Sequence, residues 1–273
     1  MSDGILYEVD DPVATIRLNR PEKLNALNYP MLRALRAAVD DAAADPRVVG
    51  IVITGEGRGF CAGLDASVLA KTSAAGSAGK PAEAAGELPG LVSYLLRIPK
   101  PVIAAVNGPA AGGGFVLAAL CDVRFASTNA SFTTVFSKRG LVSEHGTSWI
   151  LPRLVGAGRA LELLWSSRKV GAEEALRVGL VEFVTPPEQL VARAREFVRE
   201  LAANVSPASL RETKRLVYDH LGIGFEPALR DADSAQWRQL DHPDALEGAS
   251  SYLEKRPPKF ARVSTRPSEG EAQ

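Results

Sequence analysis

Residues 107–122 read NGPAAGGGFVLAALCD, and this stretch decides how the rest of the chain is interpreted. Three consecutive glycines, Gly112 to Gly114, lead directly into an apolar run of helical character. The first N–H groups of a helix have no partner within the helix, and the helix dipole favours negative charge there. Glycine also lets another backbone or a ligand approach closely. The stretch therefore predicts either a tight strand-to-helix packing turn or a site for an oxyanion, and the residues alone leave both readings open.

The segments around this stretch alternate between strand-like and helix-like patterns. A second glycine-containing turn, GEGRGFCAGLD at 55–65, also follows a buried strand candidate. Asn28 is placed to cap a helix that Asp45-Pro46 ends. The strand candidates of the first half are ILYEV (5–9), VATIRL (13–18), VVGIVITG (48–55) and PVIAAVNG (101–108). Alternation of this kind indicates an α/β fold.

The second half of the chain is predominantly helical in pattern. One further strand is predicted within VGLVEFVT at 178–185. Thr185-Pro186 and Ser206-Pro207 each open a predicted helix, because proline is favoured at the first helical position. Between Ala70 and Glu87 large apolar residues are scarce, which predicts a mobile loop. The last residues, 262–273, are expected to form a disordered tail.

Composition is that of an ordinary globular chain. The 273 residues suggest one large or two small domains, and 46% hydrophobic content can build a sizeable core. Lys+Arg and Asp+Glu both number 32, so neither a nucleic acid nor a membrane is expected as a partner. The first residues lack the pattern of a signal peptide, which predicts a cytoplasmic protein. Cys61 and Cys121 have no CxxC spacing and are expected to be small buried residues.

Several standard chemistries do not fit the residues. The third glycine of a GxGxxG fingerprint would stand at Phe60, and Gly79-Lys80 lacks the context of a phosphate-binding loop. The three histidines are scattered without metal-ligand spacing, and no GxSxG motif occurs. Dinucleotide, nucleotide-triphosphate, metal and serine-hydrolase chemistries are therefore not expected, and no metal or separate cofactor is predicted.

Four stretches resemble the crotonase (enoyl-CoA hydratase/isomerase) superfamily of acyl-CoA enzymes. They are RPEKLNALN (20–28), GFCAGLD (59–65), NGPAAGGGFVLAALCD (107–122) and EKRPPKF (254–260), in the order and at the spacing of that family. The resemblance implies a spiral of ββα units over residues 1–200. It also implies a C-terminal helical segment at 201–261 that assembles homotrimers, which are often paired into hexamers.

The same resemblance implies where an acyl-CoA thioester would bind. CoA belongs to the substrate, and the thioester oxygen would lie between the backbone N–H groups of Leu64 and Gly113, a hole that stabilises an enolate. For Lys23 and Lys259 the alternative is a solvated surface lysine, and the expected role of Asp65 and Asp122 is turn and cap hydrogen bonding. The residues implied at the CoA or acyl site are Lys23, Leu24, Ala26, Ala62, Asp65, Val116, Phe136, Lys259 and Phe260, the last two from the C-terminal region of this or a neighbouring subunit.

Carboxylate positions distinguish reactions within the family. Hydratases that resemble its type enzyme carry glutamates where this chain has Val116 and Phe136, neither of which can hold water or carry a proton. Glu144 stands where the family's 3-enoyl-CoA to 2-enoyl-CoA isomerases, and related ring-opening isomerases, carry their acid. The resemblance thus favours an isomerase with Glu144 as acid and base. The alternatives are a hydratase or thioester hydrolase in which Glu144 directs water, and a noncatalytic acyl-CoA binding protein. His145 is expected to be a structural or surface residue, since adjacent side chains usually diverge.

Overall fold

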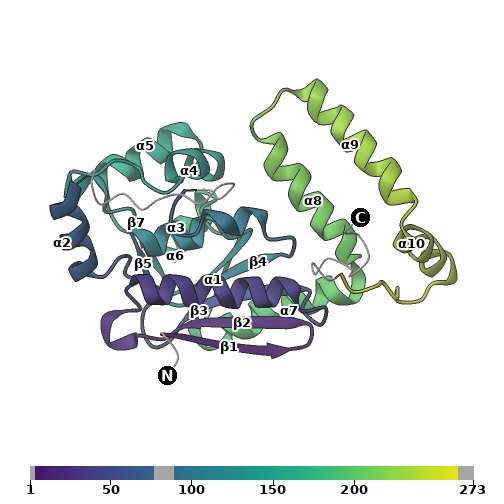
Figure 1. Cartoon of the computed structure of the whole chain (residues 1–273), viewed down its shortest axis with the longest axis horizontal. Helices are drawn as coiled ribbons and strands as arrows, with labels where there is room; N and C mark the ends of the chain where they lie inside the picture. Colours follow the sequence, from purple (N-terminus) through teal and green to yellow (C-terminus); the bar gives the residue numbers. More distant parts are fainter. Residues whose placement is uncertain (1–3, 77–88, 264–273) are drawn as a thin grey trace.

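A mainly parallel sheet forms the centre of the computed structural model, which describes residues 4–76 and 89–263 (Figure 1). Within these residues the sheet has six strands in the order β1-β2-β3-β4-β6-β9. Only β1 and β2 pair antiparallel; the other neighbours are parallel. The strands are β1 (Ile5–Asp10), β2 (Val13–Leu18), β3 (Gly50–Gly55), β4 (Val102–Val106), β6 (Val123–Ser127) and β9 (Phe183–Thr185).

The structure also contains a second, smaller sheet, and two of its strands each come after a main-sheet strand in the chain. Among the described residues it consists of β5 (Pro109–Ala111), β7 (Ser131–Thr133) and β8 (Val170–Gly171). β5 follows β4 closely, and helix α3 (Gly113–Ala119) comes directly after it. β6 and β7 repeat the same step from the main sheet to the small one. This repetition is the predicted spiral of ββα units, and the α/β fold class is confirmed.

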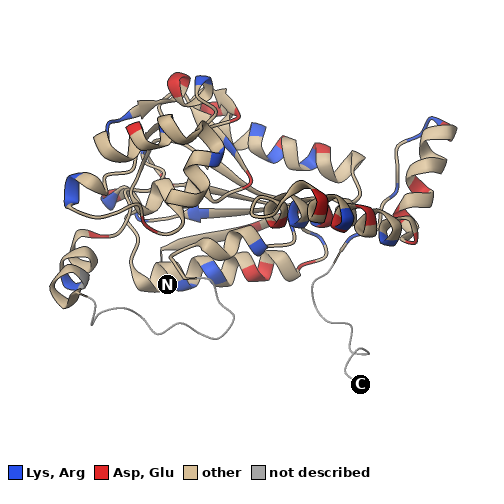
Figure 2. Ribbon diagram, turned by 90° about the horizontal axis from the view of Figure 1, so that it is seen from above, with Lys and Arg blue, Asp and Glu red and all other residues tan. Residues whose placement is uncertain are grey.

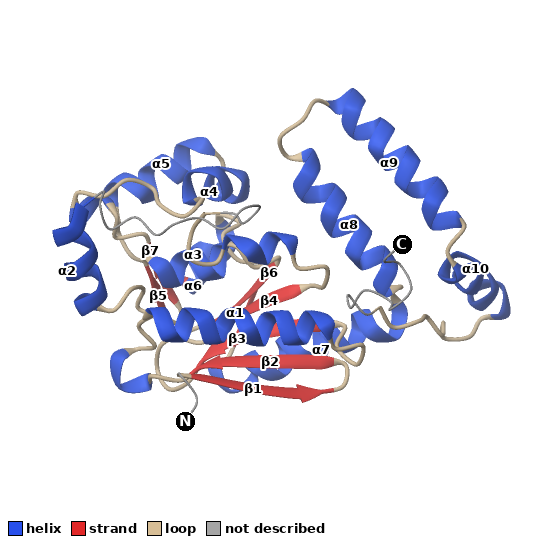
Figure 3. Cartoon of the chain, in the orientation of Figure 1, coloured by secondary structure: helices blue, strands red, loops and turns tan. Residues whose placement is uncertain are grey.

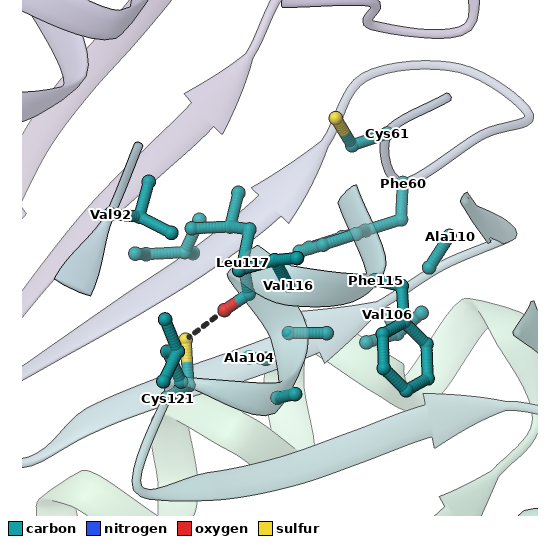
Figure 4. Close-up of a cluster of buried hydrophobic side chains, with 14 of the residues drawn as sticks. Phe60, Cys61, Val92, Ala104, Val106, Ala110, Phe115, Val116, Leu117 and Cys121 are labelled. Atoms are coloured by element: carbon teal, nitrogen blue, oxygen red, sulfur yellow. Dashed lines mark hydrogen bonds between the residues drawn. The ribbon is translucent and has the colours of Figure 1, made fainter. Parts of the chain in front are cut away.

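Both faces of the main sheet are covered, which explains why its strands are continuous apolar runs. All six residues of β3 are buried. Ile51 and Ile53 pack in the larger core cluster, and Val52 between them packs in the smaller one, as the two-residue period of a strand requires. Helix α7 (Leu190–Asn204) covers the smaller cluster, while α1 (Tyr29–Ala44) and α3 lie against the larger one. Figure 4 shows the part of the larger cluster around α3.

Most remaining helices lie around the sheets or beyond them (Figure 3). The α-helices are α2 (Ala66–Ala75), α4 (Thr147–Val155), α5 (Ala157–Ser166), α6 (Ala172–Arg177), α8 (Pro207–His220), α9 (Phe225–Leu240) and α10 (Pro243–Glu254). Short 3-10 turns are η1 (Pro21–Lys23), η3 (Ser93–Arg97), η4 (Ser137–Arg139) and η5 (Pro187–Gln189). No helix of the described ranges is both long and apolar enough to cross a bilayer. In the view of Figure 2, basic and acidic residues are interspersed along the chain.

Several predicted elements are confirmed. The Asn28 side chain caps α1 by accepting a hydrogen bond of 2.9 Å from the Met31 N–H. Helices α7 and α8 begin at Leu190 and at Pro207, close to the predicted starts. Both cysteines are free and buried. The boundary predicted at residue 200 falls inside α7, whose buried face packs on the sheet.

Two predicted elements differ from the structure. The mobile loop predicted to begin at Ala70 is wrong for its first residues, because α2 extends to Ala75; alanine-rich sequence has high helix propensity even without large apolar side chains. The rest of that prediction, at 77–88, lies outside the described residues, as does most of the predicted tail, at 264–273. Within 178–185 only Phe183–Thr185 forms a strand, since Gly179 adopts a left-handed conformation (φ 78°) just after α6.

Helices α8, α9 and α10 project from the core and leave apolar side chains exposed (Figure 1). α8 is tied to the sheet through Asp122, which lies three residues after the last residue of α3, Ala119. Asp122 accepts hydrogen bonds from the Val102 N–H (2.7 Å), Lys214 Nζ (2.7 Å) and Tyr218 Oη (2.9 Å). Asp122 therefore joins segments far apart in the chain, beyond its predicted turn role. The exposed large apolar residues of this region are Val217, Leu221, Ile223, Phe225, Leu229, Trp237, Leu240, Leu246, Tyr252 and Leu253.

Candidate active site

The two N-terminal stretches of the candidate CoA site lie side by side and pair through their backbones. Ala62 donates its N–H to the Leu24 carbonyl (2.9 Å), and Leu27 donates to Gly63 (2.7 Å). Asp65 in turn donates to the Leu27 carbonyl at 2.8 Å. Residues 24–27 and 62–65 thus form a short parallel ladder. Leu24 and Ala62 are partly exposed on it and Ala26 is buried, so the structure brings these three predicted residues together.

Asp65 holds the ends of this ladder. Its carboxylate accepts hydrogen bonds from the Ser67 N–H (3.1 Å) at the start of α2, from Arg20 Nη2 (3.0 Å) and from Lys23 Nζ (3.3 Å). The Ser67 backbone, then the Arg20 guanidinium, hold the pKa of Asp65 well below its usual range. The expected cap role of Asp65 is confirmed. Arg20 also donates to the Ala26 carbonyl at 2.6 Å, a link that sequence reasoning missed.

Two asparagine side chains, the buried Asn25 and the half-buried Asn107, fix the glycine turns behind the ladder. Asn25 Nδ2 donates to the carbonyls of Glu56 (2.9 Å) and Gly59 (2.8 Å). Asn107 Nδ2 donates to Gly57 at 2.9 Å, and its Oδ1 accepts the Gly55 N–H at 3.1 Å. Both asparagines belong to the quoted stretches, but their partners are loop carbonyls that no local pattern marks. They hold the two glycine turns in one block.

The predicted oxyanion donors come together where the two glycine turns meet. A Cβ added to Gly63 would lie 3.1 Å from the Gly113 nitrogen and 2.7 Å from the Ala111 carbonyl oxygen. A Cβ on Gly114 would lie 2.1 Å from the Cys61 carbonyl oxygen, so α3 starts in direct backbone contact with this turn. Within the described part of the chain, the N–H groups of Leu64 and Gly113 have no hydrogen-bond acceptor. The close-packing reading of the glycine run is therefore confirmed, and the oxyanion reading stays a prediction for which two N–H groups are available.

Glu144 lies in the turn between η4 and α4. Its carbonyl accepts hydrogen bonds from the Thr147 N–H (2.9 Å) and Oγ1 (2.6 Å). Its side chain is 30% exposed, and Oε2 lies 3.4 Å from His145 Nε2. His145 has a left-handed backbone (φ 52°), which turns two adjacent side chains toward each other. The expectation that His145 would diverge from Glu144 is therefore wrong.

Residues 90–92 connect this turn to the oxyanion donors. A Cβ added to Gly90 would lie 3.6 Å from His145 Nδ1. One added to Gly113 would lie 3.3 Å from Leu91 Cδ1, and Val92 is fully buried in the core. One short segment thus contacts both the imidazole next to Glu144 and the start of α3. Residues 90–91 therefore border both the turn that holds Glu144 and the first residue of α3.

The two positions at which related hydratases carry glutamate are apolar and buried. Val116 is 0% and Phe136 is 4% exposed, and both belong to the larger core cluster. Figure 4 shows Val116 among core side chains on α3.

Burial raises the pKa of the Cys61 thiol to about 12, and Cys121 Sγ donates to the Leu117 carbonyl at 3.2 Å (Figure 4). These cysteines are packing residues, as expected.

Lys259 and Phe260 lie far from the other predicted CoA-site residues of the same chain. The Lys259 N–H donates to Glu247 Oε1 (2.6 Å), and Phe260 packs near Gly248, both on α10. Figure 1 shows α10 at the opposite end of the molecule from α2, which begins beside the ladder.

Among the residues placed by the structure, no group of three or more His, Cys, Asp or Glu could hold a metal ion.

Comparisons with known proteins identify the family of this chain. Residues 8–263 match the family model described as enoyl-CoA hydratase/isomerase. A protein of Thermus thermophilus named putative enoyl-CoA hydratase is 38% identical over 248 residues, covering 91% of this chain and 97% of the relative. The 1,2-epoxyphenylacetyl-CoA isomerase of Escherichia coli is 35% identical over 265 residues, covering 95% and 99%.

Solved structures extend the likeness to three dimensions. A putative enoyl-CoA hydratase from Streptomyces coelicolor superimposes with a TM-score of 0.86 at 33% identity, covering 95% of this chain and 94% of that one. The match spans the sheets and the C-terminal helices alike. The chain therefore belongs to the enoyl-CoA hydratase/isomerase family of the crotonase superfamily, whose members act on acyl-CoA thioesters.

Proposed function

We propose that this family member is an acyl-CoA isomerase that converts 3-enoyl-CoA to 2-enoyl-CoA with Glu144 as its single acid and base. One observation carries the proposal: Glu144 is held in a turn beside the segment that contacts the amide pair, while Val116 and Phe136 are buried and apolar. A hydratase of the two-glutamate type needs carboxylates at both of those apolar positions. An isomerase needs only one.

The chemistry follows from these groups. The Glu144 carboxylate removes a proton from C2, and the C–H electron pair forms the C1–C2 double bond of a dienolate. The negative oxygen lies between the N–H groups of Leu64 and Gly113, and each such donor typically lowers the barrier by about 3 to 4 kcal/mol. The Glu144 carboxyl then returns the proton to C4, which leaves the double bond between C2 and C3 and restores the thioester carbonyl. No water is consumed.

The names of two relatives point to two other reactions as alternatives. The Escherichia coli relative is named for the isomerisation of an epoxide, and a related ring isomerisation would use the same acid and the same amide pair. The Thermus thermophilus relative is named a hydratase. In that reaction, or in thioester hydrolysis, Glu144 would activate water.

The proposal extends to binding and assembly. The ladder of residues 24–27 and 62–65 would hold CoA, with Lys23 and Leu24 along its nucleotide; the Lys23 side chain is 54% exposed. Lys259 and Phe260 would reach this site from a neighbouring subunit. A trimer, or a hexamer built from two trimers, would cover the apolar side chains of α9 and α10. Light scattering at micromolar concentration should give a multiple of three subunits, and a stable monomer would contradict it.

The test of function is a substrate panel with product identification. Purified protein is incubated with 3-enoyl-, 2-enoyl- and saturated acyl-CoA, and products are identified by mass and absorbance. Isomerisation without a mass change supports the proposal. A gain of 18 mass units or the release of free CoA favours the hydratase or hydrolase instead, and binding without turnover favours a noncatalytic role.

Glu144→Gln tests the proposed acid directly. It keeps the shape of the side chain but removes the base, so kcat should fall about 100- to 10,000-fold while binding persists. The matched control is Glu188→Gln, which changes an exposed glutamate in η5 and should leave kcat unchanged. Near-parent turnover by Glu144→Gln would remove Glu144 from the mechanism.

A further inference from the structure

The pair of Glu144 and His145 lies in a turn with an unusual backbone conformation. His145 has φ 52° and Gly146 has φ 82°, so two successive residues of the turn are left-handed. A left-handed histidine is uncommon and costs free energy that the surroundings must offset. The Thr147 N–H and hydroxyl hold the turn through the Glu144 carbonyl, and Thr147 is fully buried. The conformation brings Nε2 to 3.4 Å from Oε2 of Glu144.

The environment favours the neutral form of the imidazole. Burial lowers the pKa of His145, and the Glu144 charge opposes this effect. Because the pKa is lowered, the ring carries one N–H proton at neutral pH. Residues 89–93, packed against its Nδ1 side, include no ionisable side chain. On α4 the cation Arg153 lies over the Trp149 ring, 4.3 Å from its centroid. Among the described residues, Glu144 is thus the charged group that faces the imidazole.

We infer that His145 is a positioning residue for Glu144: the neutral imidazole donates Nε2–H to Oε2 and leaves Oε1 as the oxygen that exchanges a proton with the acyl chain. The inference rests on the proposed function of Glu144. One oxygen of a carboxylate that is 30% exposed would otherwise rotate freely and be hydrated. The 3.4 Å contact is an ion-pair distance and not yet an aligned hydrogen bond in the unliganded site, and bonds of this kind tighten when substrate binds.

Kinetics of substituted enzymes separate this role from simple packing. His145→Phe fills the space without a donor and should lower kcat about tenfold with KM nearly unchanged, as expected for a lost hydrogen bond to a charged group. His145→Gln places an amide N–H near the Nε2 position and should keep kcat within about threefold of the parent. His220→Gln is the matched control, because it changes another histidine–carboxylate pair, with Asp231 at 3.1 Å, and should leave kcat unchanged.

The pH profile gives a second readout. Protonation of His145 would place an imidazolium beside Glu144 and weaken the carboxylate as a base, so kcat should fall as pH decreases through the His145 pKa. His145→Gln has no such proton, so this part of the acidic limb should disappear. Equal activity and identical acidic limbs in the parent and His145→Phe would overturn the inference.

A titration followed by NMR needs no turnover. The chain has only three histidines, so His145→Gln assigns the His145 signals. The Glu144 charge raises the His145 pKa, so Glu144→Gln should lower it further, by about half a unit or more at a separation near 3.4 Å. An unchanged His145 titration overturns the pairing even in an active isomerase. Absence of isomerase activity overturns only the proposed function, because the titration still measures the pair.

Discussion

The two sides of the candidate active site are built by different means. On the oxyanion side the donors are backbone groups, held by contacts so close that a single methyl group would not fit at Gly63 or Gly114. On the acid side the group is a side chain, in a turn whose glycines Gly140 and Gly146 have no atom within 4 Å of an added Cβ. An added side chain meets backbone atoms on the first side and no neighbouring atom on the second, where only the left-handed backbone of the two glycines disfavours it. In the proposed mechanism, this difference would let one fold keep enolate stabilisation while its acid changes position.

The largest effect is expected from closing the space on the oxyanion side. Gly114→Ala would place a Cβ 2.1 Å from the Cys61 carbonyl oxygen, and α3 would have to move away from the turn. The free energy of unfolding should fall by about 3 to 5 kcal/mol in a urea titration. Gly158→Ala in α5, where an added Cβ meets nothing within 4 Å, is the control and should stabilise the protein by about 0.5 kcal/mol. Equal stability of the two variants would contradict the comparison.

A carboxylate introduced on the oxyanion side should lower the free energy of unfolding slightly less than Gly114→Ala does. Val116→Glu buries an acid at a position that is 0% exposed, where the charge has no partner and the group must be protonated in the folded state. Unfolding free energy should fall by about 2 to 4 kcal/mol. Val142→Glu makes the same change in the Glu144 turn, at a residue 79% exposed, and should change stability by less than about 0.5 kcal/mol.

The same variant tests whether acids are interchangeable across the site. Combined with Glu144→Gln, Val116→Glu should not restore isomerisation, because the proton would be handled from the wrong side of the dienolate. Recovery of the parental kcat would show that the position of the acid is not decisive.

The smallest effect concerns Asp65, which belongs to the backbone-held side. Its pKa is lowered by the Ser67 N–H and by Arg20, so its contribution to stability is full above the unfolded pKa of about 3.9 and is lost as pH falls below it. Asp65→Asn keeps an N-cap for α2 but cannot titrate. The Tm of this variant should fall less steeply than that of the parent as the pH is lowered from about 5 to about 3. Asp40→Asn, at an exposed pair with Arg36, should keep the parental slope.

What the sequence predicts well is local. The cap at Asn28, the strand β3 and the glycine run before α3 follow from neighbouring residues, and all are present. The resemblance of four stretches correctly predicts the family and fold. The roles of Glu144, Leu64 and Gly113 remain proposals, although the structure makes the two amides available.

What the sequence does not predict depends on segments that meet only in the folded chain. The Nδ2 groups of Asn25 and Asn107 donate to carbonyls 31 to 50 residues away, and nothing local marks these partners. The contact of His145 with Glu144 depends on a left-handed backbone that the sequence pattern does not specify. Helix α2 was missed because its apolar pattern is weak and its start is fixed by Asp65, which other elements hold in place.

Helix α3 connects two features that have been described separately. Its first residue, Gly113, carries one amide of the proposed oxyanion hole, and Asp122, just past its other end, holds α8 through Lys214 and Tyr218. α8 leads into the helices that would associate with other subunits. A short, fully buried helix of this kind transmits small shifts rather than absorbing them. Specific activity should therefore depend on protein concentration, and an enzyme diluted below the dissociation constant of its subunits should lose turnover before it unfolds.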